Sequence, residues 1–480
     1  MLTYQDFEPY IDLPAAKAEF VQTVINEHIA SEPYRLAVTA DMYDRKQNTG
    51  VDEYLAAMED IDFKLNKIRP PDIRPAAVKT GIFQRLNVQR TSYSLGNGVT
   101  FADENIKEAL GTGFDERLYQ LGYYACIHGE AFGYWNLDHL DVIPLTRFAP
   151  LYDERNGRLR AGVYFWRLQP DTPIRATLYE EAGYTNYGAT ADDETLLQDG
   201  EMHAYKVTTV GSDDYGEESV LGESYGSLPI VPLWGGRLRQ STLVELKPSI
   251  DQYDLIVNGF CNDLQDCAQV YWLVSNYGGM QDDDLRRFTQ RLKCNHIANV
   301  DNAGGDGSVT PYTQEIPTQA RETLLKRLHD SMYEDFGGLD VHCVDASSTN
   351  DHLEAAYQPL DENARDFEKQ VTKFIKQVLK LAGLPDERPT FTHQRISNTK
   401  EQADMVLSEA SIIGNDVAID LLPNLTPEQK QQAKDALAAE SAERETMDET
   451  DDADASSTFD YEHSSYKQAL EALKWKFENT

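Results

Sequence analysis

A heptad repeat of apolar residues in the middle of the chain is the feature that most limits how this sequence can fold. Its members, separated alternately by three and four residues, are Ile250, Tyr253, Val257, Phe260, Leu264, Cys267 and Tyr271. A helix with this spacing presents one apolar stripe to a neighbouring helix. About 22 residues at about 1.5 Å each predict a rod about 33 Å long. Its other faces carry Asp251, Asp254, Asn258, Asp263 and Asp266.

The same pattern returns later in the chain. A second seam consists of Leu360, Ala364, Phe367, Val371, Phe374, Val378 and Leu381, and Pro359 at its start predicts a kink. A shorter helical pattern between the two seams consists of Leu325, Leu328, Met332 and Phe336. Long helices joined by small inserts can form an ordinary helical core or pack against further copies of the chain, and the periodicity is compatible with both.

Strand patterns are concentrated in the first half. Short aromatic and β-branched runs lie at 131–136, 145–152, 160–167 and 174–179, and Asn156-Gly157 between two of them predicts a hairpin. Residues 1–68 and 397–440 have helical patterns, whereas 180–225 is predicted to form loops on short strands. The fold class is therefore α+β and mainly helical. The acidic segment 441–458 is predicted to lack fixed structure.

The charge of the chain limits its partners. Its 480 residues include 81 Asp and Glu against 44 Lys and Arg, a formal net charge of −37. This balance excludes a generally basic nucleic-acid-binding surface. The first residues, Met1–Asp6, lack the basic and apolar regions of a signal peptide, and no apolar run is long enough to span a bilayer. We therefore expect no membrane association.

The sequence contains no complete motif for catalysis, metal binding or phosphate binding. The five cysteines form no Cys-x-x-Cys pair, which favours reduced thiols over a zinc site or a disulfide framework. His128-Gly129-Glu130 matches the H-x-E part of zinc deaminases, but the downstream P-C-x-x-C is missing. Gly304–Gly307 is rich in glycine but lacks the Lys-Ser/Thr of a phosphate-binding loop. No catalytic residue, metal ligand or cofactor is predicted.

The order of short sequence phrases resembles the portal proteins of siphophages, the head–tail connectors of tailed bacteriophages. The phrases run through residues 20–385 and comprise Gly129–Tyr134, Pro144–Tyr152, Pro229–Leu233, Ser249–Asp254, Asn262-Asp263, Ile316-Pro317 and Ser347–Tyr357. One phrase departs from the family: relatives often carry Ser-Gly-x-Ala-Leu where this chain has Thr349–Ala355. The last hundred residues are similar only in their helical character.

The resemblance implies a portal architecture with named regions. These are a wing (1–244), a stem helix (245–271), a clip (272–316), a second stem helix (317–337), a tunnel loop (338–352), a long kinked wing helix (353–384) and a crown (385–480). In the tunnel loop, the residues expected to face DNA are Ser347, Ser348, Thr349, Asn350, Asp351 and His352. In the stem, the packing residues are Ile250, Tyr253, Val257, Phe260 and Leu264.

The resemblance also implies the partners and the location. Family members form dodecameric rings with a central channel for double-stranded DNA, and they bind the terminase large subunit, a head-completion adaptor, and the major capsid and scaffolding proteins. The expected location is the portal vertex of the virion, after assembly in the host cytoplasm. A basic cluster at the clip, Arg286, Arg287, Arg291 and Lys293, is either a solvated helix face or a contact to a partner ring or to DNA phosphate. The alternative function is an acidic cytoplasmic hydrolase that uses a pair of carboxylates.

Overall fold

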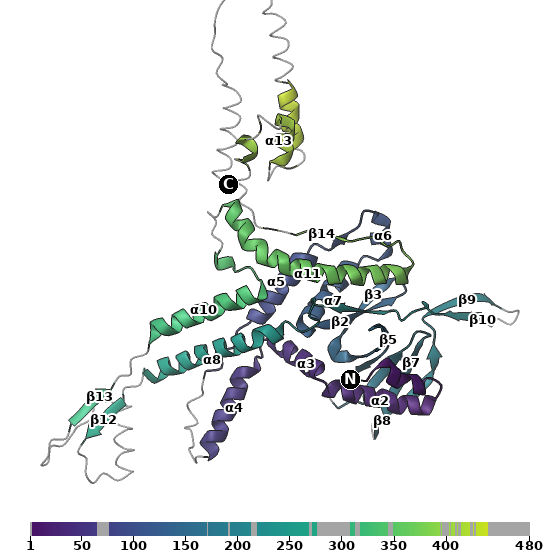
Figure 1. The fold of residues 1–480 in the computed structure, drawn as a ribbon, viewed down its shortest axis with the longest axis horizontal. Coiled ribbons are helices and arrows are strands. Elements are labelled where there is room, and N and C mark those ends of the chain that lie inside the picture. Colours follow the sequence, from purple (N-terminus) through teal and green to yellow (C-terminus); the bar gives the residue numbers. More distant parts are fainter. Residues whose placement is uncertain are drawn as a thin grey trace, which may run out of the picture. The chain divides into compact units, whose positions relative to one another are not determined.

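The computed structural model describes residues 2–64, 76–169, 171–190, 193–212, 218–267, 271–275, 308–312, 317–343 and 349–393, with parts of 395–439. These residues divide into two units. The first comprises Met1–Gly338 with Leu360–His393, and the second comprises Leu339–Pro359 with Gln394–Thr480. Helices and sheets are mixed in the first unit (Figure 1), which agrees with the predicted α+β class.

The chain begins with helices. They are α1 (Tyr4–Phe7), η1 (Glu8–Tyr10), α2 (Pro14–Ala30), α3 (Glu32–Asp44), α4 (Thr49–Lys64), α5 (Ile82–Leu95), α6 (Glu104–Ala109) and α7 (Phe114–His128). Proline stands in the first turn of both α2 and α3, where its missing N–H costs nothing. Gly129, with φ of 89°, ends α7 and turns the chain into the first sheet.

Two larger sheets form the centre of the first unit. The three-stranded sheet has the order β11 (Ile230–Trp234), β2 (Glu130–Asn136), β3 (His139–Pro144). The five-stranded antiparallel sheet consists of β4 (Phe148–Tyr152), β5 (Leu159–Trp166), β6 (Arg175–Tyr179), β7 (Tyr184–Thr190) and β8 (Asp193–His203). Both sheets place alternate side chains in a core, since successive residues of a strand face opposite sides.

Three smaller antiparallel pairs complete the strands of the described part of the chain. They join β1 (Val99–Thr100) to β14 (Thr390–Phe391), β9 (Lys206–Ser212) to β10 (Glu218–Glu223), and β12 (Tyr271–Ser275) to β13 (Ser308–Tyr312). The predicted hairpin at Asn156-Gly157 is confirmed between β4 and β5, where Gly157 has φ of 67° and its N–H donates to the Asp153 carbonyl at 2.7 Å. The prediction of loops on short strands over 180–225 is wrong, because β8 alone has 11 residues.

Three longer helices follow in the second half of the chain. They are α8 (Leu243–Cys267), α10 (Thr318–Phe336) and α11 (Asn350–Ala382). Two short 3-10 helices are η2 (Leu145–Arg147) and η3 (Val341–Cys343). In the second unit, α13 covers Asn415–Leu421, and residues 429–439 are helical. The first ten residues of α11 belong to the second unit, so α11 links the two units through Pro359.

The second predicted seam forms the largest core. Phe367, Val371, Phe374 and Val378 of α11 are fully buried with residues of α7, β2, β3 and β11. The ring of Phe374 lies so close to the backbone of β2 that a Cβ on Gly133 would stand 2.5 Å from it. A separate core joins α2 to the five-stranded sheet through Phe20, Val21 and Ile25.

Candidate functional site

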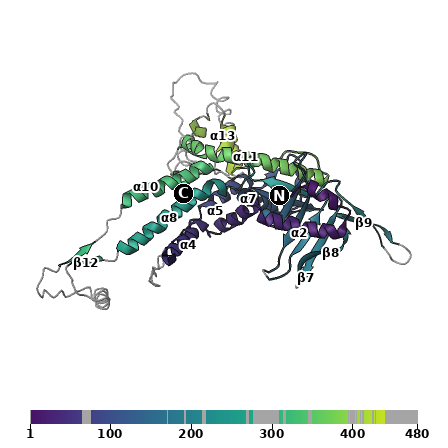
Figure 2. The same ribbon diagram turned by 60° about the horizontal axis from the view of Figure 1, so that its bottom comes forward.

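The two predicted stem helices pair in antiparallel fashion. At the first end of α8, Leu246 and Ile250 pack with Met332 and Phe336 from the last turns of α10. At the opposite end, the Asp263 carboxylate lies 2.5 Å from a guanidinium nitrogen of Arg321, in the first turn of α10. The Arg321 guanidinium also stands over the Phe260 ring, 5.6 Å from its centroid. Figures 1 and 2 both show the helices side by side.

Burial along the first seam is complete at its start and lower toward its end. Ile250 is completely buried, Tyr253, Val257 and Phe260 are half-buried, and Leu264 is 49% exposed. On α10, Leu324 near the same end is 46% exposed. One copy of the chain therefore covers the start of this seam and leaves its second half, Val257, Phe260 and Leu264, partly open to solvent. We call this half the open seam.

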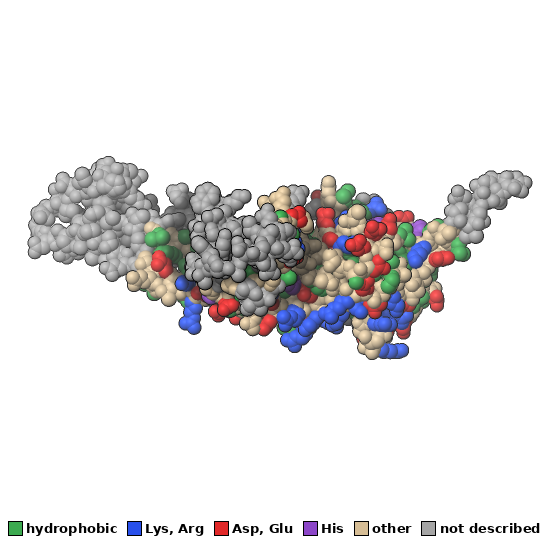
Figure 3. Space-filling view, turned by 90° about the horizontal axis from the view of Figure 1, so that it is seen from above, with side chains coloured by type: hydrophobic (Ala, Val, Ile, Leu, Met, Phe, Trp, Pro, Cys, Tyr) green, Lys and Arg blue, Asp and Glu red, His purple; other side chains and the backbone are tan. Residues whose placement is uncertain are grey.

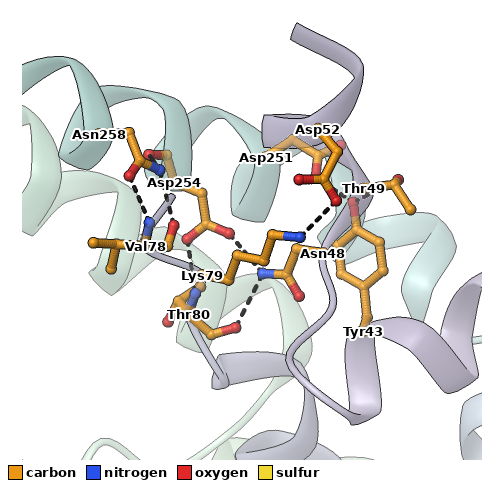
Figure 4. A network of polar contacts seen from close by, with 10 residues as sticks. All are labelled: Tyr43, Asn48, Thr49, Asp52, Val78, Lys79, Thr80, Asp251, Asp254 and Asn258. Carbon is orange, nitrogen blue, oxygen red and sulfur yellow. Dashed lines mark hydrogen bonds and ion pairs between the residues drawn. The ribbon is translucent and has the colours of Figure 1, made fainter. Parts of the chain in front are cut away.

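A different face of α8 holds an extended segment of chain. Asn258 accepts a hydrogen bond from the Val78 N–H at 2.6 Å and donates one to the Val78 carbonyl at 2.8 Å. Four residues on, Asn262 accepts from the Ala76 N–H at 2.8 Å. Four residues earlier, Asp254 accepts from the Thr80 N–H at 3.0 Å. Figure 4 shows Asp254 and Asn258 turned toward this segment.

The spacing explains how a helix can bind a strand in this way. Residues four apart on a helix lie about 6 Å apart along its axis, and residues two apart on a strand lie about 6.6 Å apart. Side chains at 254, 258 and 262 therefore meet the backbone at 80, 78 and 76 in register. Asp254 and Asn258 are only 1% and 4% exposed, which shows that this polar face is a packing surface.

The network continues into the N-terminal helices. The second oxygen of Asp254 accepts from the Asn48 side chain at 2.6 Å, while burial raises the pKa of this carboxyl group. The Tyr43 hydroxyl donates to Asp251, and Lys79 pairs with Asp52 at 2.6 Å (Figure 4). Asp251 also pairs with Lys247 at 2.7 Å. These bonds connect α8 to the N-terminal helices and to residues 76–80.

The predicted boundaries of the stem need one correction. The prediction that the first stem helix runs to 271 is wrong, because α8 ends at Cys267 and Tyr271 opens β12. Tyr271–Ser275 is an aromatic and β-branched run that pairs with Ser308–Tyr312, and such residues favour strands. The second stem helix, predicted at 317–337, agrees with α10 within one residue at each end.

The predicted tunnel loop is also shorter than expected. The loop was expected to reach 352, but α11 begins at Asn350, so Asn350, Asp351 and His352 lie in its first turn. The Thr349 hydroxyl accepts from the His352 N–H at 3.4 Å, and its carbonyl accepts from Leu353 N–H at 3.0 Å. Thr349 therefore caps a helix that begins three residues before the predicted start. Other predicted residues lie outside the described part of the chain. They are Ser347 and Ser348 of the tunnel loop, the clip cluster Arg286, Arg287, Arg291 and Lys293, and residues 441–458.

The residues of the H-x-E match contact different partners. His128 Nε2 lies 2.8 Å from an Asp41 oxygen, whereas the Glu130 carboxylate accepts from Trp234 Nε1 at 3.0 Å and from the Tyr152 hydroxyl. Burial raises the pKa of Glu130 to about 7, and the two donors oppose that shift. Each group thus has a structural partner, which favours a role in packing for this sequence match.

Comparison with known proteins identifies the family. Residues 39–446 match the family model described as phage portal protein, SPP1 Gp6-like. The chain belongs to this portal protein family. A curated portal protein of Clostridium phage phiCD119 is 25% identical over 420 residues, which cover 80% of this chain and 90% of that protein. Among solved structures, the neck of a native GTA particle computed with C12 symmetry matches with a TM-score of 0.39 and 13% identity, covering 72% of this chain and 88% of that one.

Family membership places the portal chain among structural proteins of the phage head–tail connection. None of the helices in the described ranges is both long and apolar enough to cross a membrane. Sequence reasoning found the seam of the portal chain but missed the role of its polar face. The signal was present, because Asp254, Asn258 and Asn262 recur every four residues.

Proposed function

We propose that this chain is a portal subunit that forms a closed ring with copies of itself, with a central channel for double-stranded DNA. The open seam carries this proposal. Val257, Phe260 and Leu264 continue the apolar stripe that begins at the buried Ile250, yet one copy leaves them partly uncovered. Apolar surface of this kind is stabilised when a second surface removes it from water.

A neighbouring copy is the partner that fits a ring. In a closed ring each subunit offers two different surfaces, and the same contact repeats around the axis. The paired helices supply such surfaces, because the open seam lies on α8 and the exposed Leu324 lies on α10. We propose twelve copies by analogy with the rings of the family.

The remaining regions are assigned in the same proposal. The wing comprises 1–244 and 353–384, the stem α8 and α10, the clip 272–316, and the crown 385–480. The segment 338–349 and the first turn of α11 would form the tunnel loop. The acidic balance of the chain, −37, would make the channel wall repel DNA phosphates at close range and so let the duplex slide.

The proposed partners follow from this position. The clip would bind the terminase large subunit during packaging and the head-completion adaptor afterwards, while the wing and crown would contact the major capsid and scaffolding proteins. The protein would assemble in the host cytoplasm and remain at the portal vertex of the virion. Membership of a structural family favours this function over the carboxylate-pair hydrolase.

Electron microscopy of the assembled protein is the direct test. Images of the purified chain, and of the portal vertex in particles that contain it, should show rings with a central hole. Free portal subunits can stay separate until assembly, so the particle images decide. Particles whose vertex lacks a ring of this chain, or a purified chain that remains a compact monomer or dimer and hydrolyses a glycosidic substrate, would overturn the proposal.

A further inference from the structure

The outward face of α11 carries a row of cations in a chain that is otherwise strongly acidic. The row consists of Arg365, Lys369, Lys373, Lys376 and Lys380, which we call the basic stripe. Successive members are three or four residues apart, so they share one face of the helix. Arg365, Lys369, Lys373 and Lys380 are exposed, and the Lys376 side chain is 42% exposed. The stripe extends for about 22 Å along the helix axis.

The opposite face of the same helix fixes the direction of the stripe. Phe367, Val371, Phe374 and Val378 are buried in the largest core, so α11 cannot rotate to hide its cations without opening that core. One stripe member is partly neutralised, since Lys376 lies 2.9 Å from Asp386, and Glu362 is exposed one turn before Arg365. Among the described residues, Arg365, Lys369 and Lys380 have no ion-pair partner. Lys and Arg side chains also gather along one edge of the surface in Figure 3.

The composition of the stripe indicates the kind of partner. Protein interfaces are enriched in aromatic side chains and depleted in Lys. Here four of the five cations are Lys, and the neighbouring exposed residues Glu362 and Gln377 are polar. A row of Lys and Arg along one helix is instead the usual footprint of a nucleic-acid backbone. Over about 22 Å, each strand of a B-form duplex presents about six phosphates.

We propose that the basic stripe of α11 binds the phosphate backbone of double-stranded DNA, as a second contact surface apart from the proposed tunnel loop. The contact is independent of base sequence, because ammonium groups pair with phosphates without reading base edges. The inference rests on the proposed function only in taking the nucleic acid to be double-stranded DNA. It requires neither a ring nor a channel.

The test measures binding of the full-length chain to a fluorescently labelled 24-base-pair duplex by anisotropy, at a series of salt concentrations. Neutralising two phosphate contacts with Lys369→Gln and Lys373→Gln should weaken binding at low salt at least tenfold. It should also lower the slope of log affinity against log salt by about 2. Lys369→Arg with Lys373→Arg should restore both values, since Arg also pairs with phosphate.

A matched control separates the stripe from total charge. Arg158→Gln with Arg175→Gln removes the same charge from two exposed positions, one in the β4–β5 hairpin loop and one at the start of β6, and should leave duplex binding unchanged. Equal loss in both double variants, or a parent chain that does not bind the duplex at low salt, would overturn the inference. So would a changed sedimentation coefficient with unchanged DNA binding, which would assign the stripe to a contact between copies. A failure to form rings would affect the proposed function alone.

Discussion

The two heptad seams have the same pattern in the sequence and different environments in the structure. In α11, Phe367, Val371 and Phe374 are at most 1% exposed, because strands and helices of the first unit cover this part of the seam. In α8 only the start of the seam is covered, and Leu264 is 49% exposed. An apolar seam of this kind therefore predicts that another surface packs on the helix. It does not predict whether that surface belongs to the same chain or to another copy.

The largest expected effect is on stability and concerns the buried seam of α11. Phe374→Ala should lower the free energy of unfolding by about 3–5 kcal/mol, because it leaves a cavity in a close-packed core. Phe260→Ala, the matched change in the open seam, should cost the separate subunit less, since Phe260 is only partly buried there. Urea unfolding of both variants below the concentration of assembly gives the comparison. Equal losses would show that the two seams are equally covered within one chain.

The second effect concerns assembly. Phe260→Asp places a charge in the proposed contact between copies, at a cost on the order of several kcal/mol per interface. We expect this variant to fold and to form no rings in electron micrographs. Leu168→Asp, at a position 78% exposed and far from α8 in the sequence, serves as the control and should assemble normally. Normal rings with Phe260→Asp would remove the open seam from the interface.

The third effect is a pH dependence that belongs to the covered region. Glu130 begins β2, the strand on which Phe374 packs, and burial raises its pKa from 4.5 to about 7. The folded state therefore binds the proton more tightly than the unfolded state. Its contribution to stability is complete below about pH 4.5 and is lost as the pH rises through 7, an effect on the order of 3 kcal/mol.

Glu130→Gln tests this directly, because the amide oxygen can still accept from Tyr152 and Trp234 without titrating. Urea unfolding between pH 5 and pH 8 should show a smaller fall in the free energy of unfolding for the variant than for the parent chain. Parallel curves would mean that Glu130 does not titrate in this range. The pH dependence should appear in the separate subunit, since Glu130 lies outside the open seam.

The smallest effect concerns the polar face of α8. Asn258→Ala removes both hydrogen bonds to Val78 and should cost about 2 kcal/mol, because each hydrogen bond contributes about 1 kcal/mol net to stability. Hydrogen exchange of the Val78 amide should become faster. Asn262→Ala should speed exchange at Ala76 and leave Val78 protected. Unchanged exchange in both variants would show that α8 does not hold this segment.

The sequence predicted the helices and hairpins whose signals are local. The seam spacing predicted α8, α10 and α11, and Asn156-Gly157 predicted the β4–β5 turn. The end of α8 was missed because Tyr271 fits the heptad, yet it pairs with Tyr312 in a strand. The start of α11 was missed because capping by Thr349 depends on a hydroxyl position that periodicity does not report.

The sequence by itself determined the family, the helical seams and the acidic balance, since these depend on residue order and on side-chain type alone. Only the tertiary structure decided which seam is covered, and that Asp254 and Asn258 are buried against residues 76–80. The reason is physical. An apolar or polar stripe fixes what kind of surface a helix needs opposite to it, whereas the folding of distant segments decides whether such a surface is there.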